Sequence, residues 1–185
     1  MKFFKILLPI FILLTSAIKA DSNKGLIDEL KQGKKIIFIR HAYAPGNGDP
    51  DNFDKNDCST QRNLNYQGIQ QSKKIGQFFF KNQINIKKVF SSEWCRCKDT
   101  AKYAFNEFQT FDALNSFYEF KFIKNKDKQI SDLKRFISNW NSNENIIFIT
   151  HYVVIAEILG VGVGSGEIIV SDKNYNILGL IELNY

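Results

Sequence analysis

The two histidines of the chain, His41 and His151, follow short apolar runs that end in the same way. Residues 36–41 read Ile-Ile-Phe-Ile-Arg-His, and residues 146–151 read Ile-Ile-Phe-Ile-Thr-His. Short apolar runs of this kind are typical of strands buried on both faces of a sheet. Ligands of open α/β sheets bind at the carboxyl ends of the strands. If the two strands are neighbours, both imidazoles reach one crevice.

Arginine is the second informative residue type, because the chain has 21 lysines and only four arginines: Arg40, Arg62, Arg96 and Arg135. Where a lysine-rich chain uses arginine, the planar guanidinium fork is expected to matter. Arg40 lies at the end of a predicted strand, and Arg96 lies in the first turn of a predicted helix. Guanidinium groups near helix N-termini favour a phosphoryl group. A histidine in such a pocket can attack phosphorus as a nucleophile.

Taken in order, these residues resemble a known family. The Arg-His pair, the segment Ser-Ser-x-x-x-Arg over 91–96 and the late strand ending in His151 resemble the histidine phosphatase (phosphoglycerate mutase-like) superfamily. The pattern Leu64-x-x-x-Gly68-x-x-Gln71 is similar to that family's helix opening. The resemblance runs from about Lys34 to Glu182.

The resemblance implies a role for each matching residue. His41 would be the nucleophile that forms a phosphohistidine, which water then hydrolyses. Arg40, Arg96 and His151 would complete the phosphate pocket. Arg62, which precedes the first helix of the resemblance, would line or support the pocket. Neither a metal nor a cofactor is implied.

Two positions depart from the family pattern. Ala42 replaces the usual glycine after the Arg-His pair, which is a small change. Tyr152 follows the second histidine, where the acid-phosphatase branch has aspartate, so the general acid is not located there. Glu119 is the preferred candidate, because mutase-like members keep a glutamate in this region. Glu167, Glu93 and Asp112 are weaker alternatives.

The elements around these residues predict a three-layer α/β/α sandwich with a mainly parallel sheet. Residues 42–63 are rich in glycine and proline, which predicts a long functional loop. The secondary structure of residues 109–126 is ambiguous. The glycine run 162–166 follows a predicted helix, so it predicts a flexible turn rather than a dinucleotide-binding loop. The aromatic residues of 109–126 fit either an apolar pocket wall or core packing. Strands are expected over 34–39, 84–90, 146–149, 168–170 and 177–183, and helices over 65–82, 94–108, 128–140 and 153–159.

Residues 1–20 have the pattern of a secretory signal peptide, with two early lysines, a nine-residue apolar run and small residues after it. Cleavage is expected after Ala17 or Ala20, leaving 21–185 as one domain that is secreted or periplasmic. An uncleaved anchor is the alternative, but the run is shorter than a membrane span. Without Lys2, Lys5 and Lys19 the chain carries 22 basic against 19 acidic residues. That balance gives no reason to expect nucleic-acid binding, and nothing bears on the oligomeric state.

The three cysteines are Cys58, Cys95 and Cys97. Their spacing fits no common zinc pattern, even together with the histidines, so no metal site is predicted. An oxidising compartment favours one disulfide. Because Cys95 and Cys97 are too close to bridge each other without strain, Cys58 would pair with one of them and tie the long loop to the helix that carries Arg96.

The sequence thus predicts an exported phosphatase that hydrolyses a small-molecule phosphomonoester without a metal. A phosphotransferase, a mutase or a phosphohistidine-protein phosphatase is an alternative, which export disfavours because the usual partners are cytoplasmic. A non-catalytic phosphate-binding protein is another, because the general acid is not located. The substrate itself is not indicated.

Overall fold

The computed structural model describes residues 24–183, so the predicted signal segment lies outside the described residues. Within residues 24–183 no helix is both long enough and apolar enough to span a membrane. A helix over residues 24–32, which the sequence pattern did not reveal, precedes the first strand.

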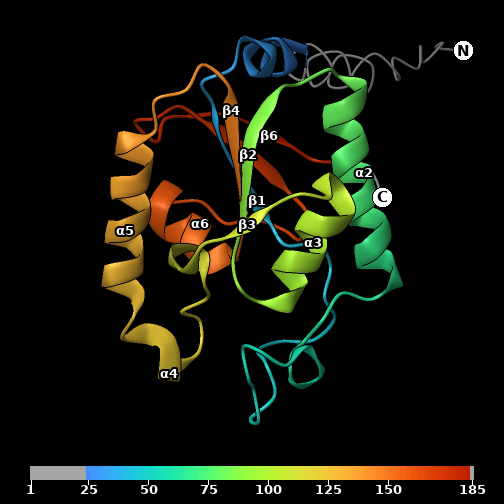
Figure 1. Ribbon diagram of the computed structural model, residues 1–185, viewed down its shortest axis with the longest axis vertical. Coiled ribbons are helices and arrows are strands. Elements are labelled where there is room, and N and C mark those ends of the chain that lie inside the picture. The colour runs from blue at the N-terminus through green and yellow to red at the C-terminus, as the bar shows by residue number, and fades with distance from the viewer. Residues whose placement is uncertain (1–23, 184–185) are drawn as a thin grey trace, which may run out of the picture.

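A six-stranded sheet forms the centre of the described chain, in the order β3-β2-β4-β1-β5-β6 (Figure 1). The strands β3, β2, β4 and β1 run parallel to one another, whereas β5 is antiparallel to both of its neighbours. The sheet is therefore mixed, with a parallel part that contains both histidine-bearing strands. Its strands are β1 (Ile36–Arg40), β2 (Ile86–Ser91), β3 (Gln109–Thr110), β4 (Asn145–Thr150), β5 (Ile168–Ser171) and β6 (Ile177–Ile181).

Helices cover both faces of the sheet, which confirms the predicted α/β/α layering (Figure 1). One face is covered by α2 and α3, and the other by α5 and α6. The helices are α2 (Tyr66–Lys81), α3 (Cys95–Phe105), α4 (Phe120–Ile123), α5 (Lys126–Asn139) and α6 (Tyr152–Leu159), with 3₁₀ turns η1 (Cys58–Thr60) and η2 (Asp112–Leu114).

Alternation along β1 explains why its sequence is apolar throughout. Ile37 and Ile39 pack in the cluster beneath α2 and α3, whereas Ile36 and Phe38 pack in the cluster on the α5 and α6 side. All four side chains are almost completely buried. A strand buried on both faces needs apolar residues at every position, which agrees with the place of β1 and β4 in the middle of the sheet.

One predicted helix ends earlier than expected, and the ambiguous segment contains short elements. The helix predicted over 94–108 ends at Phe105, because Asn106 adopts a positive φ of 65° and turns the chain. The ambiguous segment 109–126 contains β3, η2 and α4. Its aromatic residues divide, since Phe117 is buried whereas Phe120 is 91% exposed. The remaining predicted elements are present with ends shifted by a few residues.

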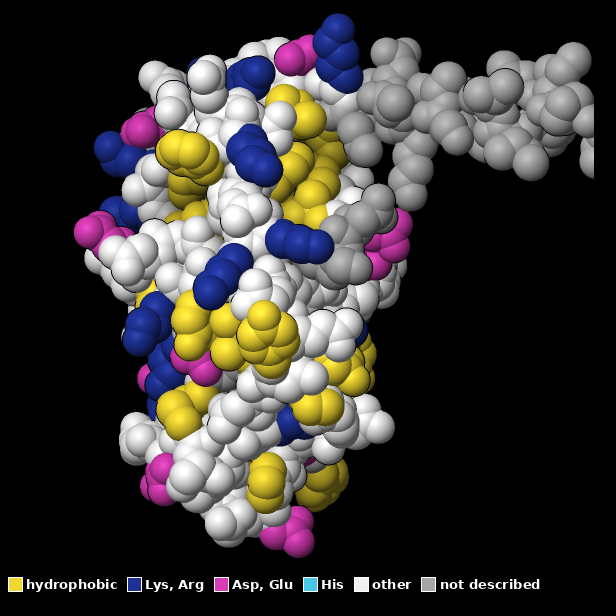
Figure 2. Space-filling model, turned by 90° about the vertical axis from the view of Figure 1, so that its right-hand side faces the viewer, with side chains coloured by type: hydrophobic (Ala, Val, Ile, Leu, Met, Phe, Trp, Pro, Cys, Tyr) yellow, Lys and Arg dark blue, Asp and Glu magenta, His cyan; other side chains and the backbone are white. Residues whose placement is uncertain are grey.

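The face over α2 is shown in Figure 2. Lysine and arginine side chains are scattered there among apolar and uncharged ones, instead of forming a continuous basic surface. Tyr66 and Phe80 of α2 are among the exposed apolar side chains of the molecule.

Candidate active site

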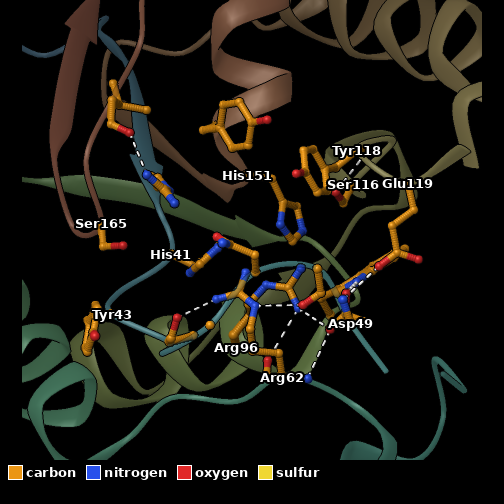
Figure 3. A pocket seen from close by; sticks show the side chains of 18 of the residues that line it. His41, Tyr43, Asp49, Arg62, Arg96, Ser116, Tyr118, Glu119, His151 and Ser165 are labelled. Carbon is orange, nitrogen blue, oxygen red and sulfur yellow. Dashed lines mark hydrogen bonds and ion pairs between the residues drawn. The ribbon is translucent and has the colours of Figure 1, made fainter. Parts of the chain in front are cut away.

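The register of β1 and β4 brings the two histidines together. Arg40, the last residue of β1, pairs with Thr150, the last residue of β4. The next residue on each strand is His41 and His151, whose ring centroids lie 5.4 Å apart at an interplanar angle of 66°. Both side chains are buried, with 2% and 3% exposed. The two similar hexapeptides, residues 36–41 and 146–151, thus end side by side at the same edge of the sheet (Figure 3).

The hydrogen bond of His41 fixes which ring nitrogen is free. Its Nδ1 lies 2.8 Å from the carbonyl oxygen of Ala42. Because a carbonyl can only accept, Nδ1 carries the proton and Nε2 keeps its lone pair. Burial, followed by the charge of Arg96, holds the pKa of His41 well below its usual value of 6.5. His41 is therefore neutral at physiological pH, with a nucleophilic Nε2.

Two guanidinium groups lie beside the histidines. Arg40 donates from Nη1 to the carbonyl oxygen of Val163 at 2.8 Å, and Arg96 donates from Nη1 to Asp49 at 2.7 Å. The Nε atoms of both arginines are buried and have no acceptor among residues 24–183. Both side chains line the same cavity. Such donors suit a tetrahedral oxyanion.

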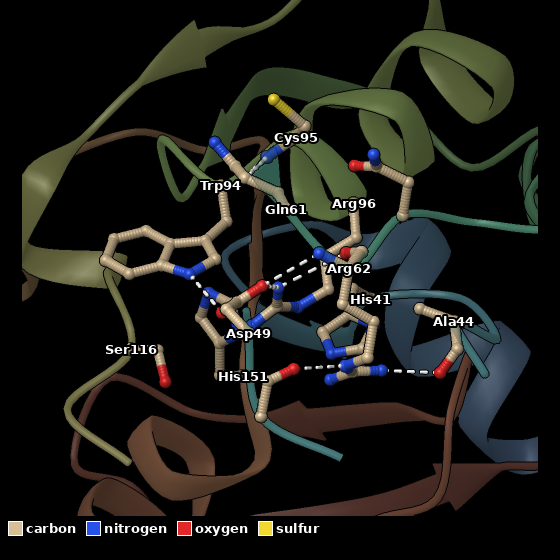
Figure 4. A network of polar contacts seen from close by, with 12 residues as sticks. His41, Ala44, Asp49, Gln61, Arg62, Trp94, Cys95, Arg96, Ser116 and His151 are labelled. Carbon is tan, nitrogen blue, oxygen red and sulfur yellow. Dashed lines mark hydrogen bonds and ion pairs between the residues drawn. The ribbon is translucent and has the colours of Figure 1, made fainter. Parts of the chain in front are cut away.

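Asp49 is a buried carboxylate that the sequence did not single out (Figure 4). Its Oδ1 accepts from Arg96 and, at 3.0 Å, from the backbone N–H of Arg62, while its Oδ2 accepts from the Trp94 indole at 3.0 Å. Burial alone would raise the pKa of Asp49, but the hydrogen bond and charge of Arg96, with the other two donors, lower it overall. Asp49 thus holds Arg96 in place as a charged partner.

Arg62 braces the long loop over 42–63. Its Nε donates to the Gly48 carbonyl at 2.8 Å, and its Nη1 donates to the Ala44 carbonyl. The side chain also lines the cavity. Its hydrogen bonds within the described residues go to the loop backbone, which fits the supporting role among the two that the sequence left open.

A disulfide fastens this loop to α3. Cys58 is bonded to Cys95, and Gln61 Oε1 accepts from the Cys95 backbone N–H at 2.9 Å. Cys97 is a buried free thiol. Of the two pairings left open by the sequence, the structure contains the one with Cys95, which holds Asp49 and Arg62 against the helix that carries Arg96.

The glycine turn and the start of α2 form a further wall. A Cβ on Gly68 would lie 2.0 Å from the Tyr43 carbonyl oxygen, so only glycine fits there. Gln71 accepts from the Tyr43 N–H at 2.7 Å and donates to the Ser165 carbonyl at 2.7 Å. These contacts explain the Gly68-x-x-Gln71 spacing, and they show that the turn is tied to the pocket by specific contacts.

The residues enclose a cavity of about 640 Å³, a volume typical of small-molecule sites. Tyr43, Tyr118 and Tyr152 line its outer part and are partly exposed. Within residues 24–183, no group of three or more His, Cys, Asp and Glu side chains is placed to hold a metal ion. The whole set of lining residues is Arg40, His41, Tyr43, Ala44, Gly46, Asn47, Gly48, Asp49, Arg62, Trp94, Arg96, Ser116, Tyr118, Glu119, Phe122, His151, Tyr152, Gly162, Val163 and Ser165.

Of the candidate acids, only Glu119 lines this cavity. Its Oε1 accepts from the Asp49 N–H at 2.7 Å, and its Oε2 lies 3.2 Å from Lys121 Nζ. Glu167, Glu93 and Asp112 do not line it. Glu167 instead accepts from the Gly164 N–H, and Glu93 pairs with Lys55. These three weaker candidates therefore do not line the cavity.

The two buried histidines predict acid sensitivity. Burial and Arg96 hold the pKa of both His41 and His151 well below 6.5 in the folded state. Between about pH 6.5 and 5, the unfolded chain gains protons that the folded protein does not take up, so stability falls as pH falls, by up to about 1.4 kcal/mol per pH unit for each histidine. Urea unfolding at pH 7, 6 and 5 measures this slope. A slope that is the same in His151→Ala as in the wild type would contradict the assignment.

Comparison with known proteins gives a consistent result. The sequence model of the histidine phosphatase superfamily (branch 1) matches residues 36–145. No curated protein matches the chain in sequence. The protein histidine phosphatase SixA, in a structure with tungstate, has a TM-score of 0.53 at 14% identity, covering 77% of this chain and 92% of that one.

Two further solved structures share the fold. Phosphoglycerate mutase from Thermus thermophilus has a TM-score of 0.59 at 14% identity, covering 81% of this chain and 99% of that one. A phosphoserine phosphatase mutant from Entamoeba histolytica, in complex with phosphoserine, has a TM-score of 0.53 at 20% identity, covering 74% of this chain and 89% of that one. The family match covers more than half of the 185 residues, and its range includes Arg40, His41, Arg62 and Arg96. The chain therefore belongs to branch 1 of the histidine phosphatase superfamily.

Proposed function

We propose that the protein is an exported phosphatase that hydrolyses a small phosphomonoester through a phosphohistidine on His41. The observation that carries this proposal is the free Nε2 of a neutral, buried His41 beside two arginines with unpartnered Nε groups among the described residues. A nucleophile and fixed anion donors in one cavity are what phosphoryl transfer needs.

The reaction would proceed in two displacements. Nε2 of His41 attacks phosphorus, the bond from phosphorus to the ester oxygen breaks, and the leaving alkoxide takes a proton from a general acid. A water molecule then attacks the phosphohistidine and gives a proton back to the same acid, the phosphorus–nitrogen bond breaks, and phosphate leaves. Arg40 and Arg96 stabilise the charge on the equatorial oxygens in both steps. No step in this scheme uses a metal ion.

We assign the general acid to Glu119, because it is the only one of the four carboxylate candidates from the sequence that lines the cavity. Glu119→Gln is then expected to lower kcat for an alkyl phosphate by about 100-fold. An aryl phosphate, whose leaving group needs little protonation, should change less than threefold. Steady-state assays of both substrates measure the difference. Equal losses for the two substrates would show that Glu119 acts otherwise.

Export is supported by two independent features. The first 20 residues have the composition of a signal peptide, and the Cys58–Cys95 disulfide belongs in an oxidising compartment. Detection of the processed chain, with its new N-terminus after Ala17 or Ala20, in the periplasm or medium would test this. Retention of the intact chain in the cytoplasm would exclude it.

A non-catalytic phosphate-binding function is the second candidate. Both oxygens of Glu119 face donors, one from Asp49 and one from Lys121, so this carboxylate is held as an acceptor. A binder needs the anion pocket but no acid. A phosphotransferase or mutase would share the first displacement and pass the phosphoryl group to a second alcohol instead of water.

The deciding experiment uses the oxidised protein with an aryl phosphate from pH 4 to 8 in the presence of EDTA. Release of phosphate at the same rate with EDTA as without it supports a metal-independent phosphatase. Binding of inorganic phosphate without turnover supports the binder. Transfer to an added alcohol at the expense of hydrolysis supports the phosphotransferase.

A further inference from the structure

A chain of hydrogen bonds leads from His151 away from the cavity. His151 Nε2 lies 2.9 Å from Ser92 Oγ, Ser92 Oγ lies 3.0 Å from Asn115 Oδ1, and Asn115 Nδ2 lies 2.7 Å from Glu93 Oε2. Glu93 in turn pairs with Lys55 of the long loop at 2.6 Å. Ser92 is completely buried. The chain therefore joins the second histidine to the disulfide-anchored loop through polar atoms only.

The orientation of the Asn115 amide in this chain is determined by two partners. Its Oδ1 accepts from the Glu93 backbone N–H at 2.9 Å, and its Nδ2 donates to the Glu93 carboxylate. A flipped amide would place a donor against the N–H and an acceptor against the carboxylate. The oxygen of Asn115 must therefore face Ser92.

This orientation decides the role of the serine. Because Asn115 Oδ1 can only accept, the single hydroxyl proton of Ser92 goes to Asn115. The Trp94 backbone N–H also donates to Ser92 Oγ, at 3.3 Å. What remains on the hydroxyl oxygen is a lone pair, so His151 must donate to it from Nε2. The proton of neutral His151 thus lies on Nε2, opposite to His41, and Nδ1 is the nitrogen that can gain a proton.

The charges around His151 keep it neutral while the pocket holds no anion. The groups that face it are Arg40, His41, Arg62, Arg96 and the Cys97 thiol, whose Sγ lies 3.5 Å from Nε2. The carboxylates that line the same cavity are Asp49, which is paired with Arg96, and Glu119. Burial and the positive charges oppose protonation, and a bound dianion would offset most of that positive charge and so favour protonation.

We propose that Asn115, acting through Ser92, is a positioning residue that keeps Ser92 an acceptor, so that His151 takes up a proton on Nδ1 when a phosphate dianion binds. The inference rests on the proposed function for the identity of the anion. Were Ser92 free to donate to Nε2, it would hold His151 in a neutral form. The chain therefore couples anion binding to proton uptake.

The histidine tautomers can be measured directly. Because the sequence has two histidines, ¹⁵N NMR of untagged protein gives two imidazole signal sets, which His41→Ala assigns. We expect the proton of His151 on Nε2 in the wild type and a mixture of tautomers in Asn115→Ala. A His151 proton on Nδ1 in the wild type, or an unchanged tautomer in Asn115→Ala, overturns the positioning role.

Sulfate is the probe for proton uptake, because it is a tetrahedral dianion that does not titrate near neutral pH. Calorimetry at pH 7.0 in two buffers of different ionisation enthalpy should show uptake approaching one proton per sulfate in the wild type and much less in Asn115→Ala. Uptake that is equal in the two proteins overturns the proposal. Absence of sulfate binding would overturn the proposed function and the uptake, whereas the tautomer measurement would still test the positioning role.

A matched variant controls for loss of stability. Asn145 is an asparagine that is completely buried, and it bonds Lys35 N, Leu30 O and Asn85 O at the opposite end of β4 from Asn115 and His151. Asn145→Ala should lower stability and leave proton uptake unchanged. Asn115→Ala and Ser92→Ala should each lower kcat/KM by about 10- to 100-fold. If the two act in one chain, the double variant loses no more than the worse single one. Multiplied losses would contradict the chain.

Discussion

Replacing His41 by alanine is expected to lower kcat for an aryl phosphate by at least about 10⁴-fold, because the proposed reaction has no other nucleophile. The covalent intermediate should disappear as well. Rapid quenching of the wild type with ³²P-labelled substrate should leave label on the protein that is stable to alkali and labile to acid, as expected of a phosphohistidine. The same experiment on His41→Ala should leave none.

His151→Ala provides the comparison for this result. It removes a pocket residue but keeps the nucleophile, so turnover should fall while label still accumulates on the protein. Added imidazole should restore part of the activity of His41→Gly, because it supplies the missing ring. Label trapped on His41→Ala would show that another residue accepts the phosphoryl group.

The second large effect is expected at Arg96, where one substitution damages both activity and folding. Arg96 and Asp49 are paired at 2.7 Å with side chains only 4% exposed. Arg96→Ala removes a donor to the phosphoryl group, which should cost about 10³-fold in kcat/KM. It also leaves the Asp49 carboxylate buried without its cation, which should cost about 3–5 kcal/mol of unfolding free energy. Enzyme assays and urea unfolding measure the two losses.

Asp49→Asn separates these contributions. The amide keeps an acceptor for the Arg62 N–H but removes the charge that balances Arg96, so Arg96 should bind an anion more strongly. Inorganic phosphate should then raise the melting temperature of Asp49→Asn more than that of the wild type. An equal shift in both would show that the Asp49 charge does not compete with phosphate for Arg96.

The histidine pair could be predicted because it depends on a simple property of parallel strands. The two Ile-Ile-Phe-Ile runs are apolar at every position, which indicates strands buried on both faces, and parallel neighbours end at the same sheet edge. The family resemblance added the sandwich fold, which the structure confirms, and Arg96, whose side chain lines the same cavity as the two histidines. Local pattern was sufficient for these residues.

Asp49 and Asn115 could not be predicted, because their positions depend on the path of irregular segments. The loop 42–63 contains four aspartates, and nothing in their neighbours distinguishes Asp49 from Asp51, Asp54 or Asp57. Asn115 follows a 3₁₀ turn in a stretch without periodicity. Only tertiary contacts, such as the Cys58–Cys95 bond and the return of the chain past Ser92, decide which polar side chains meet the arginines and the histidines.

The position of β4 in the sheet has a consequence for how the molecule folds. β4 lies between β1 and β2, although it begins at Asn145, far along the chain from both. The first pair of the β1–β4 ladder joins Ile36 to Ile146. Contacts that are distant in sequence require large loops to close and slow the folding reaction. A growing chain therefore cannot complete its central hydrogen-bond ladder until most of it has been synthesised, and the cavity that holds the two histidines forms only at that late stage.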